Sequence, residues 1–234
     1  FYNILRDTNT NVHAKRQQKL SNRLNTSRDL INFNSRISLK SEIYNQIYKT
    51  DKKMLKTNEF HSGNYYRFFP IVGLSVDTPF KMKNNKFNLT YKPSVQFVAS
   101  PGISNSNKIS NEDSTNNNYT IENISSLNRY SGSDKMDNSK RINYGISSYN
   151  DNFKFSLNQT YEFTNNSNFH IEQGNDDKLS DLLGSAEYSN NIVTNYNFRY
   201  DTNDNFTAAQ GDCGVHQGIA QIETRSVRNE GAGY

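Results

Sequence analysis

The chain has 234 residues and a formal net charge of +4, and 33% of its residues are hydrophobic. A soluble domain of this length is usually about 45–50% apolar, so the sequence is poor in residues for a conventional packed core. Disordered chains are poor in aromatic residues, whereas this chain has 15 Tyr and 14 Phe. A wall with one apolar face and one polar face satisfies both observations and is typical of a membrane β-barrel.

The same residues argue against several function classes. No run of about 18 apolar residues is present, which excludes a transmembrane helix. The 27 basic and 23 acidic residues are interspersed, so we expect no nucleic-acid-binding surface. Cys213 is the single cysteine and gives neither a disulfide framework nor a metal cluster. The four histidines are dispersed and none lies beside a candidate nucleophile, so we expect no enzyme, metal or cofactor.

The first part of the chain predicts long strands. Phe1 lies in what reads as a strand, so we expect an internal fragment of a longer protein. Residues 7–11 form a polar turn pattern, and residues 12–24 predict a weak strand. Residues 31–48 alternate clearly, with apolar side chains at odd positions and polar ones at even positions. This period of two predicts one strand with an apolar wall and a polar wall.

The remaining strands follow the same rule and are separated by connections of unequal length. We expect strands at residues 65–77, 87–99, 141–149, 153–163, 181–189 and 192–200. The predicted connections are alternately long and short, at residues 49–64, 78–86, 100–140, 150–152, 164–180 and 190–191. Outer-membrane barrels show this asymmetry, with long loops outside and short turns at the periplasm.

Charged residues test the two-faced wall. Every charged side chain of the seven clearest strands falls on the polar face, and none falls on the apolar face. A Lys or Arg facing lipid at the midplane costs about 2–4 kcal/mol, so this separation favours a membrane wall. We expect six of these charges to line the lumen: Arg36, Lys40, Glu42, Lys92, Lys154 and Arg199.

The long polar connection holds the most specific pattern. It contains Asn111-Glu112-Asp113-Ser114, then Leu127-Asn128-Arg129-Tyr130-Ser131-Gly132-Ser133-Asp134-Lys135, and Arg141-Ile142-Asn143-Tyr144-Gly145 follows as the next strand begins. Its carboxylates and bases could pair with each other, and its glycines permit turns or close backbone approach. Chemistry alone therefore predicts an ordered loop.

The order and spacing of these elements resemble the lipopolysaccharide-assembly outer-membrane protein family (LptD, or organic solvent tolerance protein). Arg67-Phe68-Phe69-Pro70 with Gly73-Leu74, and Tyr91-Lys92-Pro93-Ser94-Val95-Gln96, are similar to strands of that family. The resemblance covers residues 1–205. It departs from the family where Ile124-Ser125-Ser126-Leu127 replaces Leu-Phe and where Lys135 replaces Arg.

The resemblance implies an all-β fold, in which antiparallel up-and-down strands form part of a transmembrane barrel and, as a fragment, an open curved sheet. It implies a translocon in the outer membrane of a Gram-negative bacterium that inserts lipopolysaccharide into the outer leaflet. The implied partners are lipopolysaccharide, outer-membrane lipid, an LptE-type lipoprotein plug and the periplasmic lipopolysaccharide bridge. The loop residues expected to contact a partner or fold into the lumen are Asn111, Glu112, Asp113, Ser114, Asn128, Arg129, Gly132, Asp134, Lys135, Arg141, Tyr144 and Gly145.

Two other function classes remain open from the residues alone. A general porin or receptor barrel would show the same alternation, and only the 109–145 pattern argues against it. A soluble Asn-rich β adhesin is a further alternative, although no repeat of fixed period is present. Residues 206–234 are richer in Gly and Ala and lose the strand rhythm, so we expect an atypical tail that is non-native or disordered.

Overall fold

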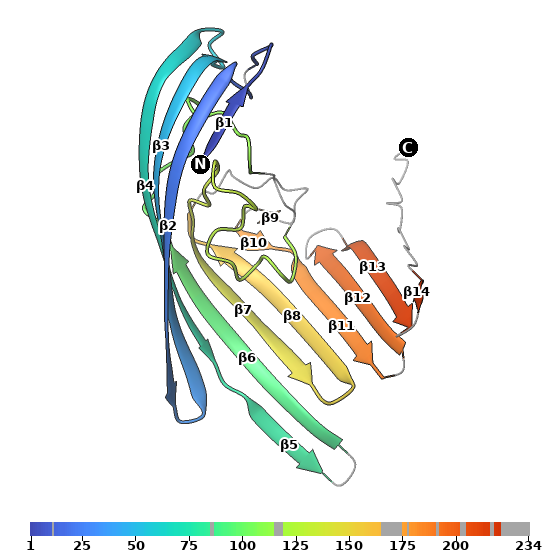
Figure 1. Cartoon of the computed structure of the whole chain (residues 1–234). Coiled ribbons are helices and arrows are strands. Elements are labelled where there is room, and N and C mark those ends of the chain that lie inside the picture. Colours follow the sequence, from blue (N-terminus) through green and yellow to red (C-terminus); the bar gives the residue numbers. More distant parts are fainter. Residues whose placement is uncertain are drawn as a thin grey trace, which may run out of the picture.

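The computed structural model describes residues 1–10, 12–84, 87–114, 119–164, 175–176, 178–190, 192–201, 205–215 and 218–220. They form one 14-stranded antiparallel sheet that is open between β1 and β14, with the order β1-β2-β3-β4-β6-β7-β8-β11-β12-β13-β14 (Figure 1). The short strands β5, β9 and β10 lie off this path. The predicted all-β, up-and-down, open curved sheet is confirmed. Among the described residues, no helix is long and apolar enough to span a membrane.

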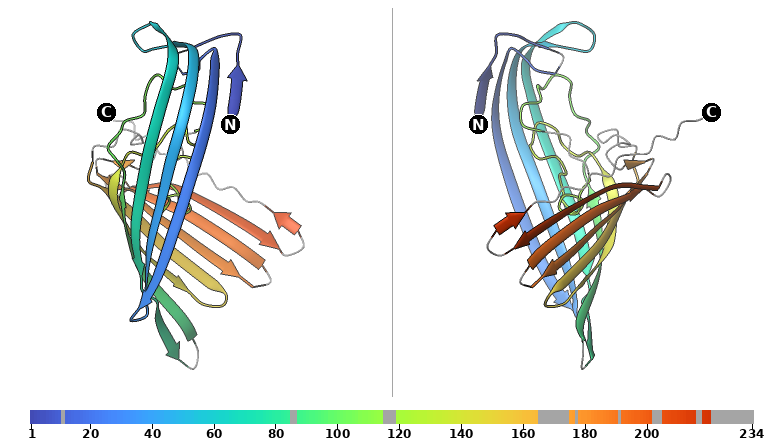
Figure 2. Two further views of the ribbon diagram at one scale, coloured as in Figure 1. Left: turned by 60° about the vertical axis from the view of Figure 1, so that its left-hand side comes forward. Right: turned by 90° about the vertical axis from the view of Figure 1, so that its right-hand side faces the viewer.

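The strands differ greatly in length. Three of them, β2 to β4, have 17, 20 and 18 residues and stand upright, whereas β6 to β13 fan away from them (Figure 2). The strand bounds are β1 Tyr2–Leu5, β2 Arg16–Asn32, β3 Ser35–Met54, β4 Phe60–Asp77, β5 Phe80–Asn84, β6 Phe87–Ala99, β7 Lys140–Tyr149, β8 Phe153–Glu162, β9 Asn175–Asp176, β10 Leu179–Ser180, β11 Leu182–Ser189, β12 Ile192–Asp201, β13 Asn205–Val215 and β14 Gly218–Ala220.

The prediction of one strand over residues 31–48 is wrong. Asn32 pairs with Ser35, so Phe33 and Asn34 form a two-residue turn between β2 and β3. Both residues have positive φ (45° and 64°), as a type I′ hairpin turn requires. Ile31 consequently pairs with Arg36 on the concave face and does not belong to the apolar row of β3.

The predicted long connection at residues 49–64 is also wrong. The ladder between β3 and β4 continues past Thr50 to Met54, paired with Phe60, which leaves a connection of residues 55–59. The register shifts between Thr50 and Lys53, and Lys52 has a positive φ of 47°. An extra residue in one strand is a β-bulge, which bends the strand and re-aims its side chains. The predicted alternation of long and short connections fails at this turn.

The other predicted strands agree closely with the structure. The strand at residues 87–99 is β6, and the two predicted hairpins are β7–β8 and β11–β12. Residues 78–86, expected as a connection, contain the additional strand β5, which pairs with β6. The weak strand predicted at residues 12–24 is part of β2, which begins later and extends further.

The two faces of the sheet have the predicted character. The convex face carries exposed apolar side chains, for example Leu39 (49% exposed), Val72 (44%) and Phe97 (51%). Cross-strand pairs place the charges of the clearest strands together on the concave face, since Arg36 pairs with Asp77 and Arg141 with Glu162. Arg28 in β2 pairs with Leu39 and is a basic residue of the convex face.

The end of the chain continues the sheet further than the loss of rhythm suggested. Residues Asn205–Val215 pair with β12 as β13, and Gly218–Ala220 pair with β13 as β14. The expectation that strands stop near residue 205 is therefore wrong for the backbone. Residues 221–234 lie outside the described residues, and the non-native origin of the tail stays a prediction.

Candidate functional site

The long loop between β6 and β7 lies against the concave face of the sheet (Figure 1). Its described residues are 100–114 and 119–139. They contact β1 to β4, β6 to β8 and β11, so the loop spans that part of the wall from the inside. The candidate site is this docked loop together with the strand residues that hold it, and the motif predicted from the sequence supplies most of its contacts.

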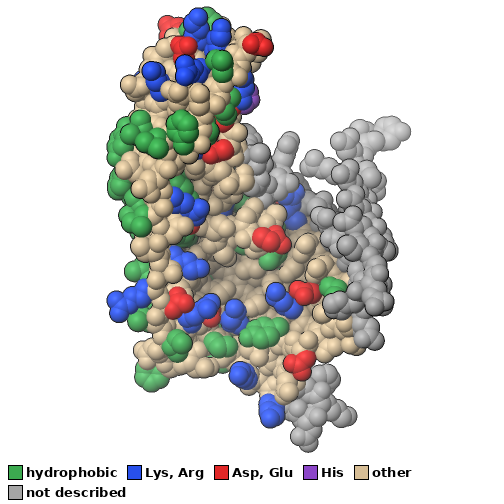
Figure 3. Space-filling model, viewed as in Figure 1, with side chains coloured by type: hydrophobic (Ala, Val, Ile, Leu, Met, Phe, Trp, Pro, Cys, Tyr) green, Lys and Arg blue, Asp and Glu red, His purple; other side chains and the backbone are tan. Residues whose placement is uncertain are grey.

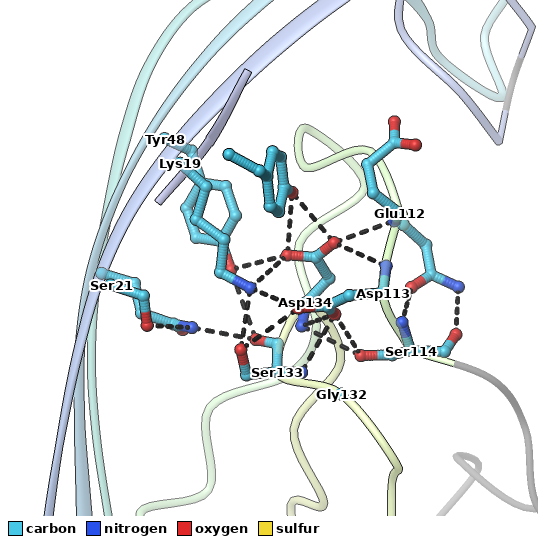
Figure 4. Close-up of polar contacts among 12 residues, drawn as sticks. Lys19, Ser21, Tyr48, Glu112, Asp113, Ser114, Gly132, Ser133 and Asp134 are labelled. Carbon is cyan, nitrogen blue, oxygen red and sulfur yellow. Dashed lines mark hydrogen bonds and ion pairs between the residues drawn. The ribbon is translucent and has the colours of Figure 1, made fainter. Parts of the chain in front are cut away.

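Two short segments of the loop hold each other through reciprocal carboxylates (Figure 4). The Asp113 carboxylate accepts the backbone N–H groups of Ser133 (3.0 Å) and Asp134 (2.7 Å). In return, the Asp134 carboxylate accepts the backbone N–H groups of Glu112 (2.8 Å) and Asp113 (3.1 Å). We call residues 112–114 and 132–134 the clasp.

Small and hydroxyl side chains make the clasp possible. A Cβ on Gly132 would lie 2.1 Å from the carbonyl oxygen of Asp113, so only glycine fits at this position. The Ser114 hydroxyl accepts the N–H groups of Asp134 and Lys135, both at 2.9 Å. Asn111 orients this turn, because its side chain both donates to and accepts from the Ser114 backbone.

Strand residues bind the clasp to β1, β2 and β3. The Lys19 ammonium lies 2.7 Å from the Asp113 carboxylate and 2.8 Å from that of Asp134. Tyr2 and Tyr48 donate their hydroxyls to the Asp134 carboxylate at 3.0 and 3.1 Å. Asp134 is 3% exposed, so this carboxylate is removed from water and satisfied by protein donors.

Further contacts extend the docking along the wall. Arg67 in β4 donates to the backbone carbonyls of Ser133 (2.5 Å) and Asp134 (2.9 Å). Arg6, just after β1, forms an ion pair with Glu112 through both guanidinium nitrogens. Gln17 in β2 exchanges two hydrogen bonds, both 2.7 Å, with the Ser110 backbone.

The clasp carboxylates are held in their charged form. Burial alone would raise the pKa of Asp113, but the Lys19 ammonium and the Asp134 backbone N–H outweigh it and lower the pKa to about 2. Burial likewise opposes ionisation of Glu112, and hydrogen bonds from Arg6 and Ser110 lower its pKa below the ordinary value. Both groups therefore stay ionised at any pH above the ordinary carboxylate range.

The middle of the loop docks through apolar packing. Leu127 lies over Gly73 of β4, where an added Cβ would be 2.4 Å from the leucine side chain. Around it lies a buried cluster that includes Phe69, Ile71 and Met136. Each of these three side chains is 0% exposed. The concave wall thus has an apolar patch that the loop covers.

A second ion network ties the loop to β7 and β8. Arg129 donates to both oxygens of Asp137, at 2.5 and 3.1 Å, and lies 3.2 Å from Glu162 of β8. Arg141 of β7 also pairs with Asp137, at 3.0 Å. All four side chains are at most 1% exposed. We call Arg129, Asp137, Arg141 and Glu162 the arginine network.

Burial and charge oppose each other at Arg129 as well. Burial alone would lower the pKa of its guanidinium, but attraction to Asp137 raises the pKa above the ordinary value, so it is always protonated. We call the clasp and the arginine network, with the strand residues that hold them, the two anchors of the loop. In each anchor the positive and negative charges are equal in number. The arginine network has two cations and two carboxylates, and in the clasp the two cations Lys19 and Arg67 balance the carboxylates of Asp113 and Asp134. Such balance is what buried charges require.

The structure brings together most of the predicted loop residues, but not all. Asn128 supports the loop by donating to the carbonyl of Gly132 (3.1 Å). The Lys135 ammonium lies 5.8 Å from the ring centre of Tyr130. Tyr144 points to the convex face, 38% exposed, and Gly145 packs against Asn158 of β8, so these two are not in the site.

The six charges expected in the lumen lie on the concave face, and four of them form ion pairs along the wall (Figure 3). The pairs are Arg36–Asp77 (3.1 Å), Glu42–Arg23 (2.8 Å), Lys154–Glu187 (3.9 Å) and Arg199–Asp181 (3.1 Å). No ion pair involves Lys40 or Lys92 within the part of the chain that the structure describes. These two lysines are the wall charges most available to a solute.

Several residues of the site were not found from the sequence. Lys19, Tyr48 and Asp137 carry the contacts but belong to no motif. Glu162 was recognised only as a polar-face charge, and Arg67 only as such a charge and as part of a strand similar to the family. One signal was present: Phe69 and Ile71 are apolar residues on the otherwise polar face of β4. An apolar patch on a wet face indicates that something covers it.

The arrangement docks the loop onto the wall of the sheet. Its acids and bases are mutually paired, and among the described residues no group of three or more His, Cys, Asp or Glu could hold a metal ion. A comparison with curated proteins finds no match. The family described as "LptD: LPS transport system D" matches residues 2–215. Because this match covers most of the chain, the chain belongs to the LptD family of lipopolysaccharide transport proteins.

Proposed function

We propose that this chain forms part of the wall of an outer-membrane translocon that inserts lipopolysaccharide into the outer leaflet. The observation that carries the proposal is the division of the sheet, with exposed apolar residues on the convex face and charged residues with a docked loop on the concave face. Such a wall presents its apolar side to lipid and its polar side to a wet interior. Family membership supplies lipopolysaccharide as the substrate class.

The concave wall has the chemistry of a saccharide and phosphate path. Beside the ion pairs it carries exposed amide and hydroxyl groups, among them Asn25 and Ser27 of β2, which lie opposite Glu42 and Lys40 of β3. Lys40 and Lys92 add positive charge on the same face. Hydroxyl and amide groups bind sugars, and ammonium groups bind phosphates.

The docked loop is our candidate contact for an LptE-type lipoprotein plug. The side of the loop that faces the wall is held by the clasp and the arginine network, whereas residues such as Glu122 remain exposed. A photoreactive amino acid at Glu122 of the full-length protein should capture the plug. The same group at Tyr144, on the convex face, should not. Equal capture at both positions would contradict this partner assignment.

The direct test of function is depletion of the full-length gene product, followed by assay of lipopolysaccharide at the cell surface. We expect surface lipopolysaccharide to fall and to recover when the intact gene is supplied again. Unchanged surface lipopolysaccharide with altered uptake of small solutes would instead support a general porin or receptor barrel.

A further inference from the structure

Within the described part of the chain, one group of basic residues has no carboxylates to balance its positive charge, unlike the two anchors. Where β3 turns into β4, Lys53 pairs in register with His61, and Lys53 donates to the backbone carbonyl of Asn107, the neighbour of Lys108. We call Lys53, His61 and Lys108 the rim cations. No carboxylate lies within ion-pair distance of them among the described residues, although the same loop is densely paired elsewhere.

Lys53 is the unusual member of the group. It is 4% exposed, yet one carbonyl is its only hydrogen-bond partner in the described chain. Buried ammonium groups are normally paired with carboxylates or bound anions, because an isolated buried charge is expensive. An ammonium has three donors, so two remain for a ligand.

The β-bulge directs Lys53 into this position. Before the bulge, even-numbered residues of β3 such as Tyr48 and Thr50 face the loop, and the odd-numbered Lys49 faces outward. The extra residue reverses this order, so that the odd-numbered Lys53 points toward the loop. Lys52 adopts a positive φ of 47°, which a lysine rarely does. The backbone therefore departs from the regular ladder at the position that turns the cation inward.

The rim cations act on one another. This end lies beyond the apolar band of the convex face, since Lys49 and Asn64 pair there. Burial lowers the pKa of His61, and the charges of Lys108 and Lys53 lower it further. Lys and Arg side chains lie at this end of the molecule in Figure 3, with Asp and Glu side chains among them. A cluster of cations in close range is stabilised by a bound anion.

We propose that the rim cations form a phosphate-binding site at the junction of the loop with the β3–β4 turn. Lys53 supplies two free donors, Lys108 an exposed ammonium and His61 a ring that gains a proton when the anion binds. The phosphate is either free in solution or carried by the head group of a glycolipid. The second source rests on the proposed function, whereas the first does not.

The test uses the histidine Cε1–H signals in the nuclear magnetic resonance spectrum of the full-length protein, with His61 assigned by His61→Asn. Inorganic phosphate at constant ionic strength should raise the pKa of His61, and chloride should not. Lys53→Met should weaken phosphate binding roughly tenfold or more, since a charge-assisted hydrogen bond is lost. Lys56→Gln, on the same turn and exposed, should leave binding unchanged.

A second arm compares a diphosphorylated glycolipid with its dephosphorylated form in mixed micelles. A His61 shift with the phosphorylated form alone identifies the lipid-borne phosphate, and a shift with inorganic phosphate alone identifies the free ion. The proposal is overturned if neither phosphate moves the His61 signal, if chloride is as effective, or if Lys53→Met binds phosphate as well as the intact protein does. The inorganic phosphate arm needs no transport, so its outcome is independent of the translocon proposal.

Discussion

The clasp and the arginine network hold the same loop by different means. In the clasp, four hydrogen bonds to the two carboxylates come from backbone N–H groups, and Asp113 remains partly exposed, with its side chain 34% accessible. In the arginine network, two guanidinium groups and two carboxyl groups pair with each other, and all four side chains are removed from water. Backbone N–H donors are held in place by the chain itself, whereas a buried charge is strongly destabilised when its partner is lost.

The difference teaches where the loop is vulnerable. Loss of the Asp137 carboxylate from the arginine network leaves the buried Arg141 guanidinium without its carboxylate and leaves Arg129 with Glu162 as its carboxylate partner. Loss of the Asp113 carboxylate leaves N–H groups at a position that water can still reach in part. We therefore expect the β7–β8 side of the loop to be sensitive to single substitutions, and the β1–β4 side to be sensitive to acid and to backbone fit.

Asp137→Asn should have the largest effect. It keeps the shape of the side chain but removes the charge shared by Arg129 and Arg141, so the free energy of unfolding should fall by about 3–5 kcal/mol. Denaturant unfolding of the full-length protein measures this. Glu187→Gln, at an exposed pair 3.9 Å from Lys154, is the control and should cost less than about 1 kcal/mol. Similar losses in both variants would contradict the distinction.

Leu127→Ala tests the apolar patch between the two anchors. Removal of this buried side chain leaves a cavity over Gly73, and unfolding should become easier by about 3 kcal/mol. Leu74→Ala, on the convex face of the same strand, should cost less in detergent because Leu74 is 42% exposed. Proteolysis of the loop under native conditions provides the second readout. A resistant loop in Leu127→Ala would show that the ion networks alone suffice.

Gly132→Ala tests the backbone fit of the clasp. The new methyl group would meet the Asp113 carbonyl at 2.1 Å, so the two segments must separate, at a cost of about 1–3 kcal/mol. Gly63→Ala is the matched control, because its nearest neighbour lies at 3.4 Å. We expect faster proteolysis of the loop in the first variant only. If the intact protein and Gly132→Ala are cleaved at equal rates, the close approach is not required.

The smallest effect is a pH dependence confined to the clasp. The folded-state pKa of Asp113 is about 2, below its ordinary value, so its contribution to stability is complete above the ordinary carboxylate range and is lost as the pH falls toward 2. The lowered pKa of Glu112 acts in the same direction. Loop proteolysis by an acid-active protease should increase across this window. Asp113→Asn should flatten the dependence, and an unchanged profile would argue against the role of this carboxylate.

The face of each strand was predictable because the hydrophobic effect and the pleat act on every second residue. The turn at Phe33 and Asn34 was not, because it contains neither Gly nor Pro and the alternation reads through it without interruption. The extension of β3 and β4 to residues 54 and 60 was hidden in the same way. Polar side chains there face water or the loop, and their composition resembles that of a connection.

The docking of the loop could be predicted only in part. Charged residues of the motif indicated an ordered segment, but a carboxylate such as Asp134 carries no mark of its partner Lys19, 115 residues away. Such long-range pairs depend on the register of β2 and on the curvature of the sheet. Phe69 and Ile71 did indicate the docking, because apolar residues on the otherwise polar face of a strand are expected to be covered by another segment.

The neutrality of the two anchors has a consequence for any charged molecule near the concave wall. A group with equal positive and negative charge has a field that decays quickly with distance, so the docked loop adds little to the long-range potential. Among the described residues, that potential comes from lysines outside the ion pairs, such as Lys40, Lys92 and Lys53. The docked loop therefore determines the shape of the concave side, and the lysines outside the ion pairs determine its long-range potential. Either property can change without altering the other.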